Sequence, residues 1–163
     1  MHYSCLILTD DHESGIESIV NKILAPYNEA ITVAPYDRDC ICTTNEQFRE
    51  LIASSDSPCP SCHDEGHYRT TRNPNSKWDY YQIGGIWNRM FGSNVVPVKT
   101  LLESGNKFHL NEIFAVVEPD GSWNEAHPLY DLSREQAAGW PERLLNILSK
   151  HENCRAILCD LHI

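Results

Sequence analysis

The sequence predicts a single α+β domain over residues 1–163, with helices packed on one face of a mainly antiparallel sheet. Three observations support this fold class. Strand-like and helix-like stretches are mixed along the chain, and a Pro-Asp-Gly turn at 119–121 indicates a hairpin. The length of 163 residues suffices for one hydrophobic core but not comfortably for two. We therefore expect residues 59–92, which lack the apolar residues for a core of their own, to be an inserted, loop-rich module.

The N-terminal third has the pattern of a strand, a helix and a second strand. Residues 3–9 run without a breaker, as in a strand buried on both faces. A capping-box pattern at Ser14 and Glu17 precedes a helix that Pro26 ends. Apolar residues at 31 and 33 then mark a short strand.

A second capping-box pattern, at Thr44 and Gln47, predicts another helix. Its spacing places Phe48, Leu51 and Ile52 toward the core. The serine, proline and aspartate residues that follow predict the start of a loop.

The last third of the chain alternates helices and strands. A short helix is expected at 98–103, and a strand at 112–117 turns back at Trp123. A helical pattern spans 133–150, and the final strand covers 155–163. In that strand alternate residues share a face, so the pattern predicts a central strand with two distinct faces.

Composition and charge favour a globular protein that does not bind duplex DNA directly. The chain is 41% hydrophobic and 22% charged, and 13 basic against 23 acidic residues give a formal charge of −10. This charge disfavours binding to a phosphate backbone and leaves a basic partner or a small ligand open. No apolar run approaches a membrane span and no signal-peptide pattern starts the chain, so we expect a cytoplasmic protein without membrane contact.

Seven cysteines in a reducing compartment indicate metal ligands and buried side chains rather than disulfides. Cys5 and Cys159 lie in apolar strands and are expected to fill the core. Cys59 and Cys62 stand in a polar, turn-rich stretch, where two thiolates form half of a tetrahedral zinc shell.

Several residues could complete that shell. His63 and His67 follow the cysteine pair closely, and a returning cysteine such as Cys40 or Cys42 is the alternative. In either case zinc would be structural, because it would hold a loop with little core. Two other interpretations remain: a pair of reduced surface thiols, and covalent haem attachment at Cys-Pro-Ser-Cys-His, which would require export.

A segment rich in aromatic residues and glycine predicts a ligand site. Aromatic faces stack bases or sugars, basic side chains meet an anion, and paired glycines allow a close backbone approach. The candidate residues are Lys77, Trp78, Asp79, Tyr80, Gly84, Gly85, Trp87 and Arg89. The alternative is that the tryptophans cover the sheet and the glycines make a turn.

Carboxylate and imidazole side chains follow the first strand and occur in the last one. If the two strands are neighbours, Asp10, His12, Asp160 and His162 could converge at one sheet end and support metal-dependent or acid-base chemistry. The alternative is that these polar residues are simply solvated.

Four stretches of the chain resemble a family of small, uncharacterised proteins of bacteriophages, prophages and mobile elements. The resemblance rests on Leu-Ala-Pro-Tyr-Asn-Glu at 24–29, on the cysteine pair followed by Asn-Pro-Asn-Ser-Lys-Trp-Asp-Tyr-Tyr-Gln-Ile-Gly-Gly at 73–85, on 117–123 and on 159–163. The chain departs from the family at Ile86, where relatives carry arginine. It also departs after the cysteine pair, where relatives carry glycines and this chain has His63, Asp64 and Glu65.

Three functions are compatible with these features. The resemblance implies an accessory protein that acts by binding, such as a counter-defence factor that sequesters a small nucleotide signal or blocks a basic host protein through its acidic surface. The first alternative is a metal-dependent hydrolase of a nucleotide or phosphoester. The second is a zinc-stabilised structural or adaptor protein.

Overall fold

The chain forms two compact units in a computed structural model that describes residues 1–54, 57–103, 107–127 and 139–163. The main unit consists of residues 1–28 and 77–163, and the small unit of residues 29–76. The boundaries differ from the predicted insertion at 59–92, because two strand pairings divide the chain elsewhere. The small unit includes both strands of a separate ribbon, whereas residues from 77 onward return to the main sheet.

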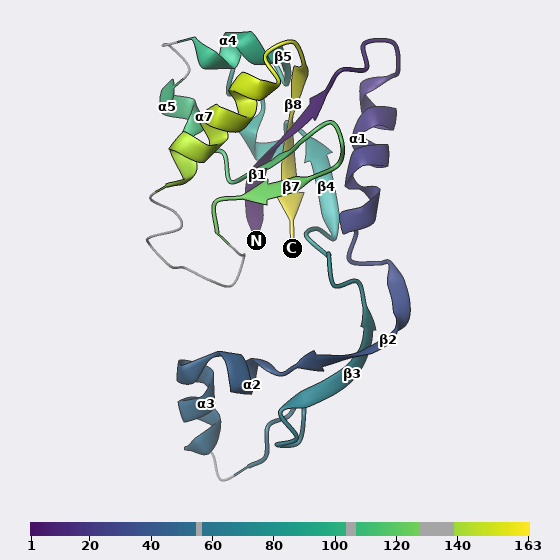
Figure 1. Ribbon diagram of the computed structural model, residues 1–163, viewed down its shortest axis with the longest axis vertical. Helices are drawn as coiled ribbons and strands as arrows, with labels where there is room; N and C mark the ends of the chain where they lie inside the picture. The colour runs from purple at the N-terminus through teal and green to yellow at the C-terminus, as the bar shows by residue number, and fades with distance from the viewer. Residues whose placement is uncertain (55–56, 104–106, 128–138) are drawn as a thin grey trace. The chain divides into compact units, whose positions relative to one another are not determined.

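The main unit is built on a six-stranded mixed sheet (Figure 1). Its order is β4-β8-β1-β6-β7, and β5 pairs with another part of β8. The strands are β1 (His2–Thr9), β4 (Tyr80–Ile83), β5 (Val95–Pro97), β6 (Ala115–Val117), β7 (Trp123–Glu125) and β8 (Arg155–His162). All pairings are antiparallel except that of β1 with β6. The α+β class with a mainly antiparallel sheet is confirmed.

Helices cover both faces of this sheet rather than the expected one (Figure 1). Because side chains alternate along β1, Leu6 and Leu8 pack with α4 (Val98–Leu102) and α7 (Trp140–Lys150). Cys5, Ile7 and their neighbours pack on the opposite face against α1 (Ile16–Leu24). The central strands are apolar on both faces, so each face requires a cover.

The predicted hairpin and final strand are confirmed. β6 and β7 pair antiparallel across a turn in which Gly121 has a φ of 90°. In β8, Ile157 and Cys159 face one cluster while Leu158 faces the other. The short helix predicted at 98–103 is α4, and a further short helix, α5, spans Lys107–Leu110. Of the helix expected over 133–150, the part from 140 is observed as α7, and 133–138 lie outside the described residues.

The helix α1 begins without the predicted capping box. Gly15 is its N-cap, and no side chain caps the helix. Instead, Asp11 Oδ1 accepts hydrogen bonds from the amides of Glu13 and Ser14, each at 2.9 Å. Bonds from Ser14 and Glu13 lower the pKa of Asp11 to about 2. The polar turn before the helix is thus organised by an aspartate. A short 3₁₀ helix, η1 (Ala25–Tyr27), follows α1.

The small unit contains a two-stranded ribbon and two helices. β2 (Thr32–Asp39) pairs with β3 (His67–Arg72), so the predicted strand-helix-strand unit does not form one sheet. The register shifts between Thr32 and Tyr36, which accommodates Pro35 in β2. The helices are α2 (Ile41–Thr44) and α3 (Glu46–Ala53).

The start and the orientation of α3 differ from the capping-box prediction. Asn45 caps the helix by accepting a hydrogen bond from the Phe48 amide at 3.0 Å, one residue after the predicted cap Thr44. Phe48 and Ile52 are half-buried, but Leu51 is 65% exposed and does not face a core. The small unit has too little apolar interior to receive all three side chains.

Candidate metal centre

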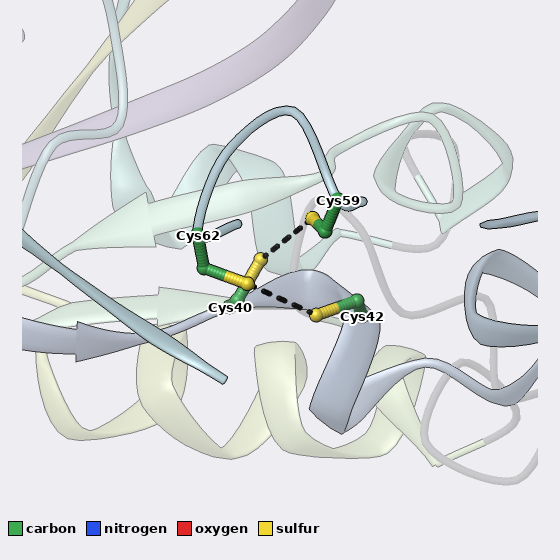
Figure 2. Close-up of side chains that lie close together, drawn as sticks. All are labelled: Cys40, Cys42, Cys59 and Cys62. Carbon is green, nitrogen blue, oxygen red and sulfur yellow. Dashed lines mark hydrogen bonds between the residues drawn. The ribbon is translucent and has the colours of Figure 1, made fainter. Parts of the chain in front are cut away.

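Four cysteine side chains converge in the small unit (Figure 2). The sulfur atoms of Cys40, Cys42, Cys59 and Cys62 all lie within 4.8 Å of one another. Cys40 Sγ is 3.6 Å from Cys59 Sγ, and Cys42 Sγ is 3.5 Å from Cys62 Sγ. The first two cysteines flank the start of α2, and the other two come from the loop before β3.

The spacing of the sulfurs suits one metal ion and excludes a disulfide in this arrangement. A disulfide needs sulfur atoms about 2 Å apart, and all four cysteines are free thiols. Four thiolates bound to one tetrahedral zinc ion at about 2.3 Å would lie about 3.8 Å from one another. The four cysteines could therefore hold a metal ion.

The loop that carries Cys59 and Cys62 is tightly turned. The His63 amide donates to the Cys59 carbonyl at 2.8 Å, and Asp64 Oδ1 accepts from the Cys59 amide at 2.9 Å. His63 and Asp64 have φ angles of 50° and 71°, in the left-handed region. The Asp64 carboxylate thus ties the end of the turn back to its beginning at Cys59.

Hydrogen bonds tie the other cysteine pair to the neighbouring elements. The Cys40 amide donates to the Gly66 carbonyl at 2.8 Å, next to β3. From α3, Arg49 donates through Nε to the Cys42 carbonyl at 3.1 Å and through Nη2 to the Thr43 carbonyl at 2.6 Å. The cluster is thus braced by α3 and by the residue that precedes β3.

The local backbone favours an ionised thiol at one position. Amides of Cys62 and Ser61 donate to the sulfur of Cys59 and lower its pKa to about 7. Burial raises the pKa of Cys42 instead. The thiolate is the form that binds metal, and the local backbone favours this form at Cys59.

The cysteine cluster is also the hydrophobic core of the small unit. Among the described residues of 29–76, the buried hydrophobic side chains are those of Cys40, Cys59 and Cys62. Ile52 and Tyr68 pack against them. A pocket of about 510 Å³ adjoins the cluster. Its lining residues are Cys42, Thr43, Arg49, Ile52, Ala53, Ser57, Pro58, Asp64 and Gly66.

The structure places Cys40 and Cys42, and not the predicted histidines, next to Cys59 and Cys62. His63 and His67 are exposed and do not belong to the ligand group. The signal for Cys40 and Cys42 was their spacing with one residue between them. That signal becomes decisive only once β2 and β3 pair, which brings residues 39 and 67 together.

Most of the predicted ligand segment makes contacts within the fold. Trp78 is 8% exposed, and its Nε1 donates to the Leu24 carbonyl at 2.9 Å. Lys77 Nζ forms an ion pair with Glu125 Oε1 at 2.8 Å. Trp87 packs against the cluster that contains α7.

The paired glycines also serve the fold. A side chain at Gly84 would come within 2.7 Å of Asn94 Cγ, and one at Gly85 within 2.8 Å of Asp160 Cγ. Because the glycines have no side chain, they leave room for Asn94 and Asp160 of the protein itself. This agrees with the alternative in which the two glycines make a turn. Tyr80 and Arg89 are exposed, and ligand contact by these two stays a prediction.

The predicted convergence of Asp10 and His12 with Asp160 and His162 is wrong. The first and last strands are neighbours, but they run antiparallel, with His2 opposite His162 and Thr9 opposite Arg155. The two acidic and imidazole pairs therefore lie at opposite ends of the strands. Six residues of extended chain separate them by about 20 Å.

His2 and Asp79, rather than Asp10 and His12, lie beside Asp160 and His162. His2 Nδ1 lies 3.0 Å from Asp160 Oδ1, and His162 Nδ1 lies 2.8 Å from Asp79 Oδ1. Sequence reasoning missed His2, because only the register of β1 with β8 reveals its neighbours.

Comparison with known proteins finds no matching family model, no matching curated protein and no matching solved structure. Among the described residues, no helix is both long and apolar enough to cross a membrane.

Proposed function

We propose that the protein acts by binding a macromolecular partner, and that a structural zinc ion in the four-cysteine centre orders its interaction surface. The observation that carries this proposal is the convergence of four thiols within 4.8 Å. Zinc and iron both accept four thiolates in tetrahedral geometry, and zinc is the usual structural ion with this ligand set.

A closed shell of four thiolates favours structure over catalysis. Catalytic zinc keeps an open position for water or substrate, whereas four protein ligands fill the tetrahedron. The small unit also needs such a centre, because its buried hydrophobic side chains, among those described, are three of the cysteines themselves. Units of this size usually require a metal or disulfides to fold.

The surface that zinc would order lies beside the cluster. The pocket of about 510 Å³ is lined by residues from α2, α3 and the cysteine loop. Ile41 on α2 and Leu51 on α3 are 44% and 65% exposed, so both helices offer an apolar side chain to a partner. The formal charge of −10 favours a basic partner and fast association with it.

Counter-defence in a phage or mobile element would be one form of this activity, and it remains a prediction from the resemblance. Nucleotide sequestration has less support, because Lys77 and Trp78 are engaged within the fold. The hydrolase alternative depends on Asp10 and Asp160 lying together, and it has less support because they lie far apart.

Metal analysis of the full-length protein tests the zinc centre. We expect the purified protein to hold one tightly bound zinc ion in the cysteine centre, lost in Cys40→Ser and Cys59→Ser and retained in Cys154→Ser, a buried cysteine of the main unit. Full zinc occupancy in the first two variants, or iron with the colour of an iron-thiolate centre, would contradict the proposal.

Cross-linking in the source cells tests the binding role. We expect the wild-type protein and Cys154→Ser to capture the same basic partner, and Cys59→Ser to lose it. Equal capture by all three proteins would show that the zinc-ordered surface is not the site of binding.

A further inference from the structure

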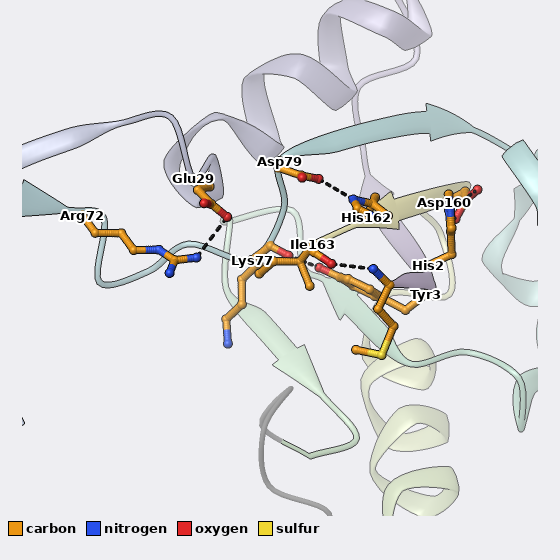
Figure 3. Close-up of polar contacts among 10 residues, drawn as sticks. His2, Tyr3, Glu29, Arg72, Lys77, Asp79, Asp160, His162 and Ile163 are labelled. Atoms are coloured by element: carbon orange, nitrogen blue, oxygen red, sulfur yellow. Dashed lines mark hydrogen bonds and ion pairs between the residues drawn. The ribbon is translucent and has the colours of Figure 1, made fainter. Parts of the chain in front are cut away.

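We propose that His2 and His162 form a second metal site, which binds a divalent late first-row transition metal through the two imidazoles. The proposal concerns the main unit and is independent of the cysteine centre. It rests on two histidines in register and on a carboxylate at Nδ1 of each ring; Figure 3 labels all four residues.

The sheet register places the two imidazoles side by side. His2 on β1 is directly opposite His162 on β8, so their side chains project from the same face. The ring centroids are 5.0 Å apart. The exposed fractions of the two side chains are 47% and 37%, which leaves both accessible to an ion from solvent.

Each ring is oriented by a carboxylate at Nδ1. His2 Nδ1 lies 3.0 Å and 3.2 Å from the two oxygens of Asp160, and His162 Nδ1 lies 2.8 Å from Asp79 Oδ1. A carboxylate at Nδ1 favours the tautomer with its proton on that nitrogen, so Nε2 carries the lone pair. Among the described residues, no hydrogen bond engages Nε2 of either ring.

This is the arrangement that metal-binding histidines usually have. Such a histidine donates its second ring N–H to a carboxylate, which raises its basicity and fixes its orientation. Two imidazoles that share a tetrahedral ion at about 2.0–2.1 Å would have ring centroids about 5 Å apart. The observed centroid separation of 5.0 Å is close to that value.

The carboxylates are themselves held in place. Asp160 is 4% exposed and accepts a hydrogen bond from the Ile86 amide at 3.2 Å, next to Gly85. The Asp79 amide donates to the His162 carbonyl at 3.0 Å, which fixes the backbone of Asp79 just before β4 begins. Positioning residues on rigid elements are what a preorganised site requires.

Imidazole ligands select the metal class. Two neutral nitrogens suit zinc, copper, nickel or cobalt ions and not calcium or magnesium, which prefer oxygen. Water would complete the shell at the exposed side, so the site would retain positions for an external ligand.

Zinc titration of the full-length, zinc-loaded protein tests the proposal by calorimetry and by ¹⁵N NMR of the imidazoles. We expect a second equivalent of zinc to bind and to shift the Nε2 signals of His2 and His162. His2→Ala and His162→Ala should each weaken this second equivalent at least tenfold. His12→Ala, an exposed histidine beyond the other end of β1, should leave it unchanged.

Asp79→Asn separates a positioning role from a merely structural one. We expect about tenfold weaker zinc binding and a changed tautomer of His162, visible in its ¹⁵N shifts, with unchanged thermal stability. A Cys40→Ser/Cys59→Ser variant should retain the imidazole-dependent equivalent, so the two metal proposals can fail separately. The proposal is overturned if excess zinc leaves both imidazoles unshifted or if His2→Ala and His162→Ala bind zinc as the wild type does.

Discussion

At the scale of single residues, Gly85 shows how the same pattern can serve a ligand or the fold. The two glycines at 84–85 are typical of a backbone that approaches a ligand closely. In the structure the group that approaches Gly85 is Asp160, whose carboxylate accepts the Ile86 amide. A buried carboxylate of the protein thus occupies the space that a ligand would need.

Gly85→Ala should destabilise the protein by about 2–4 kcal/mol. The new Cβ would overlap Asp160, and a φ of 49° disfavours a side chain. Denaturant unfolding measures the change in free energy. Gly92→Ala is the matched control, because Gly92 has a φ of 80° but no atom within 4 Å of the added carbon. Its cost should be about 1 kcal/mol, and equal costs at the two positions would contradict the overlap with Asp160.

At the scale of elements, both helix starts differ from those that the capping-box pattern predicts. Capping boxes at Ser14 and Thr44 were both plausible from residue type and spacing. The structure instead uses Gly15 with an aspartate-organised turn for α1, and Asn45 for α3. Several polar residues stand near each start, so residue type and spacing alone do not decide where the helix begins.

Asn45→Ala should destabilise α3 by about 1 kcal/mol, because the Phe48 amide loses its acceptor. Hydrogen exchange of the α3 amides measures the loss. Thr44→Ala is the control at the predicted but unused cap, and it should have less than half the effect. A larger effect at Thr44 would show that the capping box forms in solution.

At the scale of the whole molecule, the two units rest on different kinds of stabilisation. The main unit buries two hydrophobic clusters, one on each face of its sheet. The buried hydrophobic side chains described in the small unit are three of its cysteines. Stability should therefore depend on metal in residues 29–76 and on hydrophobic burial elsewhere.

Removal of metal with a chelator should abolish amide protection in α2, α3 and the cysteine loop while β1 and β8 remain protected. Hydrogen exchange with mass spectrometry on the full-length protein, before and after chelation, measures this difference. Re-addition of zinc should restore protection. Uniform loss across both units, or no loss in 29–76, would contradict a local structural role for the metal.

The sequence alone determined the features that depend on local pattern. Three local patterns predicted the central strands and the fold class: the alternation in 155–163, the turn at 119–121 and the apolar run at 3–9. They could do so because side-chain periodicity follows from backbone geometry. The spacing of Cys59 and Cys62 likewise indicated a candidate metal site.

Only the tertiary structure decided which distant residues meet. Strand direction and register are set by long-range pairing, so they placed Asp10 away from Asp160 and brought His2 to His162. The pairing of β2 with β3 likewise brought Cys40 and Cys42 to the cysteine loop in preference to the nearer histidines. A short-range sequence pattern can therefore identify side chains that are chemically suited to a site. Which of these side chains lie together in one site depends on how the whole chain packs.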